Sequence, residues 1–256
     1  MCGISGFIDY NHTSSNEMLR SMNRTLAHRG PDGEGYFFEE NNLFQLGLGH
    51  RRLSIIDLTN AGHQPMIYKH LTIVFNGEMY NYAEVKNELV QSGHTFASHS
   101  DTEVILHAFE EWGSDCIHKF IGMFAFVIFN QENRELYAFR DRAGVKPFYY
   151  YFHQGLFLFA SELKAIVNHS GFDKKLNLHA VASFLNYAYV PAPHCIYDHT
   201  LKLKPGHFLH IKLNTRELST TQYWNVYDYY NKPKLKIYLH EAIDQTEKIL
   251  QSAFNY

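Results

Sequence analysis

A succession of short apolar segments between residues 123 and 160 constrains the fold of this chain more than any other feature. Several of the segments are apolar at consecutive positions, a pattern that indicates β-strands covered on both faces. Turn residues such as Asn130, Gly144 and Gly155 separate them. We therefore expect sheets buried between other layers. The segments are residues 124–129, 135–140, 148–152 and 156–159.

Helical patterns lie in groups rather than alternating with these strands. Two adjacent helices are predicted, each followed by a glycine in the position where helices stop, Gly93 and Gly113. Ser14 and Glu17 resemble a capping box that opens an earlier helix. Grouped helices between groups of strands favour an α+β layered sandwich over an alternating parallel sheet. The predicted helices are 82–91, 102–112 and 178–187, and further strands are predicted at 3–8, 43–47, 71–75 and 206–212.

Composition excludes several classes of protein. The 256 residues carry a net charge of -3, which offers no electrostatic footprint for nucleic acid or an anionic membrane. Neither a signal peptide nor an apolar run of membrane-spanning length is present, so we expect a cytoplasmic protein with no membrane partner. The three cysteines, Cys2, Cys116 and Cys195, fit neither a disulfide framework nor metal-ligand spacing. We expect no metal site, with Cys116 and Cys195 inert.

The pattern changes near the C-terminus. Residues 1–214 are predicted to form one domain, residues 215–234 a polar linker, and residues 235–256 the first helix of a further domain. No glycine-rich phosphate-binding loop occurs, so the sequence gives no reason to expect ATP or another cofactor in this chain. We expect the chain to be one part of a longer or split protein.

Cys2 is the strongest candidate for chemistry. Removal of Met1 would leave its thiol beside its own α-amine, whose ordinary pKa of about 8 makes it a usable base. Nucleophile and base would then be one residue. The alternative is that Cys2 is an incidental small buried residue, and position alone does not decide between the two.

Several segments resemble, in order and spacing, the class II glutamine amidotransferases, and most closely the glutamine-hydrolysing asparagine synthetases. The resemblance extends from Met1 to about Tyr223 and implies a four-layer αββα sandwich of the N-terminal nucleophile hydrolase type, with mainly antiparallel sheets. The matching segments are Met-Cys-Gly-Ile-Ser-Gly-Phe at 1–7, His-Arg-Gly-Pro-Asp-Gly at 28–33, His-Arg-Arg-Leu-Ser-Ile-Ile-Asp at 50–57, Phe-Asn-Gly-Glu-Met-Tyr-Asn at 75–81, Ser-Asp-Thr-Glu at 100–103, Gly-Met-Phe-Ala-Phe at 122–126, Arg-Asp-Arg-Ala-Gly-Val-Lys-Pro at 140–147, Ser-Glu-Leu-Lys-Ala at 161–165 and Tyr-Val-Pro-Ala-Pro at 189–193.

The resemblance also implies site residues. Cys2 would be the nucleophile, and the Asn76 amide with the Gly77 N–H would form the oxyanion hole. Arg52 would bind the α-carboxylate of glutamine and Asp101 its ammonium. The rest of the pocket would be Leu53, Ser54, Ile55, Ile56 and Glu78.

Local sequence offers other interpretations of these residues. Asn76 and Gly77 are typical of a tight turn, Arg52 of a solvated surface residue, and Asp101 of a helix N-cap. Arg29 and Asp32 could order the loop over the thiol or serve structure alone.

The function implied is hydrolysis of glutamine to glutamate and ammonia. A synthetase domain, joined in cis or acting in trans, would use the ammonia, ATP and magnesium to amidate aspartate. Two alternatives remain open at this point: a glutaminase that serves another acceptor, and a non-catalytic regulatory relic. The sequence also leaves open whether the chain forms a homodimer.

Overall fold

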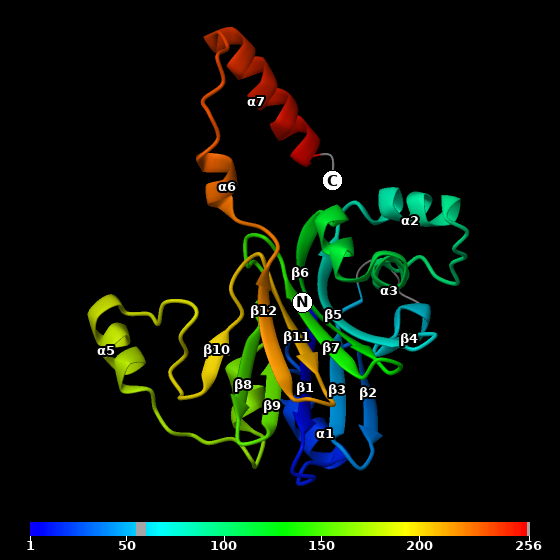
Figure 1. Ribbon diagram of the computed structural model, residues 1–256, viewed down its shortest axis with the longest axis vertical. Coiled ribbons are helices and arrows are strands. Elements are labelled where there is room, and N and C mark those ends of the chain that lie inside the picture. The colour runs from blue at the N-terminus through cyan, green and yellow to red at the C-terminus, as the bar shows by residue number, and fades with distance from the viewer. Residues whose placement is uncertain (55–59, 255–256) are drawn as a thin grey trace. The chain divides into compact units, whose positions relative to one another are not determined.

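The computed structural model describes residues 1–54 and 60–254 and divides into two compact units, Met1–Tyr223 and Trp224–Tyr256. Unit 1 contains the sheets and most helices (Figure 1). The strands are β1 (Gly3–Asp9), β2 (Gly33–Glu40), β3 (Gln45–Arg52), β4 (Met66–Tyr68), β5 (Leu71–Met79), β6 (Gly122–Asn130), β7 (Glu135–Arg140), β8 (Tyr149–His153), β9 (Leu156–Ala160), β10 (Thr200–Lys202), β11 (His207–Lys212) and β12 (Glu217–Gln222). The α-helices are α1 (Asn16–Arg24), α2 (Tyr82–Gln91), α3 (Asp101–Trp112), α4 (Leu163–Val167), α5 (Leu178–Tyr187), α6 (Val226–Tyr230) and α7 (Leu239–Phe254).

Unit 1 is built on two six-stranded sheets whose strands pair antiparallel. The order is β10-β8-β9-β1-β3-β2 in the first sheet and β12-β11-β7-β6-β5-β4 in the second. The N-terminal strand β1 is therefore internal: it pairs with β3, with Gly3 opposite Arg51, and with β9, with Ser5 opposite Ala160. This double pairing holds the residue before β1, Cys2, at a sheet end.

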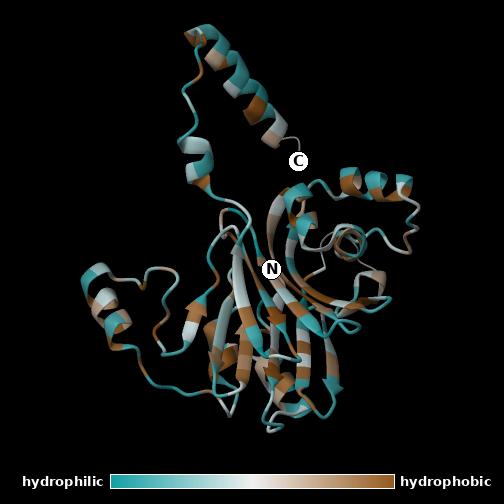
Figure 2. Ribbon diagram, viewed as in Figure 1, coloured by the Kyte–Doolittle hydropathy of each residue, from teal (hydrophilic) through white to brown (hydrophobic). Residues whose placement is uncertain are grey.

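Three apolar clusters define four layers. One cluster fills the space between the sheets and includes Ile4, Val74 and Phe159. A second packs α2 and α3 against the second sheet, and a third packs α1 and α4 against the first. Figure 2 shows hydrophobic residues concentrated along the strands. The predicted four-layer αββα sandwich is thus confirmed, and the consecutive apolar residues of β6 and β9 are buried on both faces.

The structure corrects three local predictions. Ser15, not Ser14, caps α1, accepting a hydrogen bond from the Met18 N–H at 3.2 Å, because the Ser14 hydroxyl binds the buried Asp9 carboxylate instead. Strand β2 was not predicted. Strand β3 runs to Arg52, five residues beyond the predicted strand 43–47, and is paired with β1 and β2.

The domain boundary also differs from the predicted one. Residues 217–222 form β12, which pairs with β11 along its whole length, so the sheet continues where a linker from residue 215 was expected. The hydroxyl of Tyr223 then donates to the Arg140 carbonyl at 2.7 Å. The side chains of β12 are mostly exposed on both faces of the sheet, so the strand lacks the apolar alternation that predicts a half-buried strand. The last helix begins at Leu239 rather than at residue 235.

Candidate active site

A cleft of about 180 Å³ lies at the ends of β1, β3 and β5. All the predicted site residues within the described part of the chain line it. Ile55 and Ile56 lie outside the described residues. The volume suits a ligand smaller than the drug-sized molecules that fill pockets of about 300–1,000 Å³. The predicted residues that line the cleft are Cys2, Arg52, Leu53, Ser54, Asn76, Gly77, Glu78 and Asp101.

Cys2 lies at the start of β1, with its thiol against the backbone of Leu53. The sulfur accepts a hydrogen bond from the Leu53 N–H at 3.4 Å, and the thiol contacts the Leu53 carbonyl oxygen at 3.6 Å. Burial raises the pKa of the thiol and outweighs the lowering by the Leu53 N–H and the chain-terminal amine. The thiol is therefore protonated at neutral pH, and a nucleophilic role requires a base.

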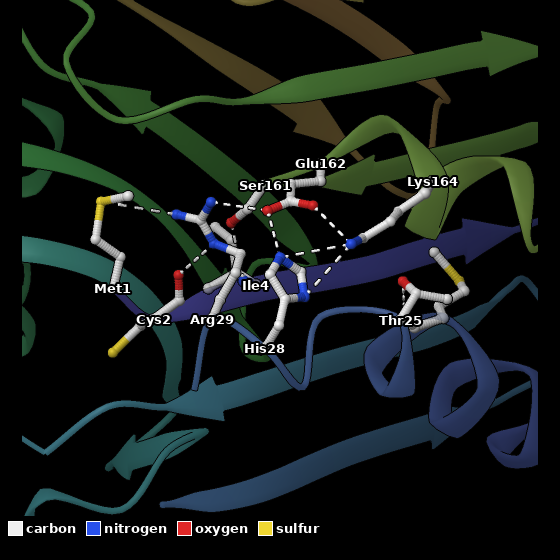
Figure 3. Close-up of polar contacts among 10 residues, drawn as sticks. Met1, Cys2, Ile4, Thr25, His28, Arg29, Ser161, Glu162 and Lys164 are labelled. Atoms are coloured by element: carbon white, nitrogen blue, oxygen red, sulfur yellow. Dashed lines mark hydrogen bonds and ion pairs between the residues drawn. The ribbon is translucent and has the colours of Figure 1, made fainter. Parts of the chain in front are cut away.

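An ion-pair cluster fixes the N-terminal backbone (Figure 3). Arg29 donates from Nε to the Cys2 carbonyl at 2.9 Å and from Nη1 to Glu162 Oε1 at 2.9 Å. Burial raises the pKa of Glu162, but donors from Arg29, Lys164 and His28 outweigh it and lower the pKa to about 2. Glu162 thus stays ionised and holds Arg29 in place. The structure assigns Arg29 to the Cys2 backbone, a contact that its loop position did not reveal.

Asn76 has a buried side-chain amide whose nitrogen and oxygen lack a hydrogen-bond partner among the described residues. Buried polar groups are nearly always paired, so an amide of this kind lining a cleft is available to a ligand. The predicted turn at Asn76 and Gly77 is wrong, because both residues lie within β5. A Cβ on Gly77 would lie 2.7 Å from the Phe124 Cα, so a glycine at this position allows β6 to lie close to β5.

Arg52 and Asp101 approach the cleft from opposite layers. Arg52 ends β3 in the first sheet, and Asp101 begins α3. Asp101 is not the N-cap, since Ser100 fills that position and accepts a hydrogen bond from the Thr102 N–H. The Asp101 carboxylate instead accepts from the Met79 N–H at 3.1 Å. Burial raises its pKa to about 6, against the lowering by the Met79 and Thr102 N–H groups.

The structure adds cleft residues that sequence reasoning did not single out. Gln64 accepts from the Phe75 N–H at 2.6 Å and donates to the Thr102 hydroxyl at 3.1 Å, which ties the cleft wall together. Asp32, named from the sequence as a possible loop-ordering residue, lies outside the lining but accepts from the Ser54 N–H at 2.9 Å and so orders a wall segment. Lys146 follows Val145 in the Gly-Val-Lys-Pro segment, and its burial has no local signal in the sequence. The added lining residues are Met1, Gly62, Gln64, Phe75, Ser100, Thr102, Met123 and Lys146.

The described part of the chain contains neither a cluster of metal-ligating side chains nor a membrane-spanning helix. Across residues 1–54 and 60–254, histidine, cysteine and carboxylate side chains do not gather in a group of three or more that could hold a metal ion. Within the same residues no helix combines the length and apolarity that spanning a bilayer requires.

The two facing antiparallel sheets, with a cysteine directly before an internal N-terminal strand, define the class of N-terminal nucleophile hydrolases. Solved structures of this shape include the allosteric regulatory enzyme of purine biosynthesis, with a TM-score of 0.67 and 18% identity over 87% of this chain and 49% of that one. Glutamine phosphoribosylpyrophosphate amidotransferase from B. subtilis has a TM-score of 0.61 and 17% identity over 87% of this chain and 49% of that one. At this identity the likeness supports the fold alone.

Sequence similarity then identifies the family. Residues 1–224 match the glutamine amidotransferase domain, and the chain belongs to that family of enzymes. It is 38% identical to a protein named putative asparagine synthetase [glutamine-hydrolyzing] 2 of Methanocaldococcus jannaschii, over 99% of this chain and 51% of the relative. It is 39% identical to asparagine synthetase [glutamine-hydrolyzing] 1 of Bacillus subtilis, over 80% of this chain and 33% of the relative. The chain thus spans about half of the length of the first relative and about a third of the second.

Proposed function

We propose that this chain hydrolyses glutamine to glutamate and ammonia, with Cys2 as the nucleophile after removal of Met1. The observation that carries the proposal is one cleft that joins the Cys2 thiol, the Asn76 amide, a guanidinium and a carboxylate, the amide having no partner among the described residues. Arg52 and Asp101 match the carboxylate and ammonium of an α-amino acid. The thiol and the Asn76 amide match the needs of acyl transfer at its side chain.

The proposed mechanism follows from the positions of these groups. The α-amine of Cys2 takes the thiol proton, and the sulfur attacks the side-chain carbonyl carbon of glutamine. Negative charge then develops on the carbonyl oxygen, where the Asn76 amide and the Gly77 N–H donate hydrogen bonds. Breakage of the carbon–nitrogen bond, with a proton from the amine, releases ammonia and leaves a thioester. Water hydrolyses the thioester to glutamate.

The direct test is a glutaminase assay on the purified chain, with intact-mass measurement to establish whether Met1 is removed. We expect measurable release of glutamate by the protein lacking Met1, and loss of at least about 10³-fold in Cys2→Ala and Cys2→Ser. Cys195→Ala is the matched control, because Cys195 is a buried cysteine outside the cleft and should leave turnover unchanged. Full activity in Cys2→Ala, or in a protein that keeps Met1, would overturn the mechanism.

We further propose that the ammonia serves asparagine synthesis by a synthetase half that binds aspartate, ATP and magnesium. The names of the relatives support this acceptor. The second candidate is a glutaminase that serves another acceptor, since one relative, of Gibberella zeae, is named an amidase and not an asparagine synthetase. Mixing the chain with a separately expressed synthetase half should yield asparagine from glutamine, aspartate and ATP. Glutamine hydrolysis that stays uncoupled from aspartate amidation would favour the second candidate.

A further inference from the structure

Lys146 presents a buried cation to the cleft that the proposed mechanism leaves unused. Its residue is 4% exposed and lines the cleft with Cys2 and Asn76. Among the residues that the structure describes, its ammonium makes no hydrogen bond or ion pair. Buried charges are costly unless paired, so a lysine held in this way indicates a ligand group that pairs with it.

The loop that carries Lys146 is rigid. The buried Asp141 carboxylate accepts from the N–H groups of Val145 at 2.9 Å and of Lys146 at 3.0 Å. Arg140 donates from Nε to the Lys146 carbonyl and from Nη2 to the Gly144 carbonyl, each at 2.8 Å. Both sides of the loop are therefore tied to the end of β7. The position of the ammonium is set by the fold rather than by a flexible surface loop.

Lys146 and Arg52 enter the cleft from different flanks. Arg52 ends β3, a strand of the first sheet, whereas Lys146 follows β7, which lies beyond β6 in the second sheet. Asn76 lies on β5, between β6 and β4 in that sheet, and Met123 of β6, which is opposite Glu78, also lines the cleft. Arg52 thus suits the α-carboxylate of the substrate. Lys146 lies on the other flank of the cleft, away from that carboxylate.

The chemistry of the reaction supplies a second anion. In thioester hydrolysis water adds to the acyl carbon, the carbon–sulfur bond breaks, and the sulfur regains one proton. The acid that forms loses the other proton at neutral pH, so the neutral side-chain amide of glutamine becomes the γ-carboxylate of glutamate. Glutamine carries no net charge and glutamate carries one negative charge, while the cleft offers the cations Arg52 and Lys146 against the carboxylates Glu78 and Asp101.

From the burial, the rigid loop and this placement, we propose that Lys146 pairs with the γ-carboxylate of glutamate and makes the cleft retain its product. The inference rests on the proposed glutaminase function. Lys146 then distinguishes glutamate, the product, from glutamine, the substrate, since an ammonium binds a carboxylate much more strongly than it binds a neutral amide. Glutamate is therefore expected to bind at least as tightly as glutamine and to inhibit turnover.

The test measures binding of glutamate and of glutamine by calorimetry in the Cys2→Ala chain, where no turnover consumes the ligand. Adding Lys146→Met should weaken glutamate binding roughly tenfold or more and glutamine binding by less than about threefold. Lys146→Arg should retain glutamate binding. Lys175→Met is the matched control, because the Lys175 side chain is 69% exposed, pairs with Asp198 and lies outside the cleft. In the chain with Cys2 intact, Lys146→Met should raise the inhibition constant of glutamate by a similar factor.

The outcomes separate this inference from the proposed function. Absence of glutaminase activity in the unaltered chain would overturn the proposed function. An active chain in which Lys146→Met weakens both ligands equally, or neither, would overturn the role of Lys146. If Lys146→Met fails to fold, judged by circular dichroism, the Cys2→Ala chain still decides: glutamate that binds more weakly than glutamine contradicts a cation placed for its γ-carboxylate.

Discussion

At the scale of single residues, the cleft separates groups that serve opposite ends of the proposed substrate. The Asn76 amide is buried and unpartnered among the described residues, and the Cys2 thiol is held by the Leu53 backbone. Arg52 lies at the end of a different strand. Substitutions at these positions should therefore affect different kinetic constants.

Asn76→Ala should lower kcat about 10²- to 10³-fold with little change in KM, because its donor acts on charge that develops in the transition state. Arg52→Ala should mainly raise KM, roughly tenfold to a hundredfold, because a hydrogen bond to a charged group contributes about 1.5–3 kcal/mol in both ground and transition states. Steady-state glutamine hydrolysis measures both. An Asn76→Ala variant altered only in KM would refute the oxyanion assignment.

Asp101 predicts an acid limb in the pH profile. Below its pKa of about 6 the carboxyl is neutral and cannot pair with an ammonium, so kcat/KM for glutamine should fall roughly tenfold per pH unit below pH 6. The limb should be absent in the residual activity of Asp101→Asn.

The same group has the opposite effect on stability. Its folded pKa exceeds the ordinary value of 3.8, so the folded state binds the proton more tightly and the stability contribution falls as pH rises from about 4 to 6. Asp101→Asn should raise Tm at pH 7. A lower Tm there, with the acid limb unchanged, would contradict both effects.

At the scale of elements, the contact between β5 and β6 shapes the proposed oxyanion hole. Gly77→Ala would bring a Cβ to 2.7 Å from the Phe124 Cα and 2.8 Å from its Cβ. We expect a loss of stability of about 1–3 kcal/mol together with reduced turnover, because the strands must separate to accept the methyl group. Gly33→Ala is the control, since its nearest neighbour would be the Arg52 Cβ at 3.8 Å. Urea denaturation measures the loss of stability, and the glutaminase assay measures turnover. Equal stability and equal turnover in the two variants would contradict this role of Gly77.

Strand β12 yields a test of the domain boundary. A fragment of residues 1–214 lacks β12, leaves β11 as an exposed sheet edge and loses the Tyr223 hydrogen bond to Arg140. A fragment of residues 1–223 keeps all of them. We expect the longer fragment to have the higher Tm and the shorter one to aggregate, because an unpaired strand edge invites pairing between chains. Equal thermal stability of the two fragments would show that β12 adds nothing to unit 1.

At the scale of the whole molecule, the cleft lies entirely within unit 1. The fragment of residues 1–223 should therefore hydrolyse glutamine as fast as the 256-residue chain. Unit 2 carries exposed apolar side chains on α7, among them Leu239, Ile249 and Phe254. The longer chain should self-associate more readily in sedimentation experiments, since a continuous apolar face is prone to association. Identical sedimentation of both proteins would contradict this expectation.

Local signals in the sequence determined much of this protein. The bounds of α2 and α5 agree with the ranges predicted from their periodicity, and α2 ends before its predicted stop glycine, because helix hydrogen bonds join near neighbours. The burial of β6 on both faces followed from its consecutive apolar residues. Cys2 stood out by its position, and ordered segments indicated the family.

Only the tertiary structure decided how distant segments meet. The pairing of β3 with β1 placed Arg52 beside Cys2, and the β5–β6 contact explained Gly77, which local sequence had assigned to a turn. The edge strand β12 and the buried Lys146 had no local signal, since pairing and burial depend on residues far away along the chain. The cleft itself is assembled from several layers, and no single segment contains its geometry.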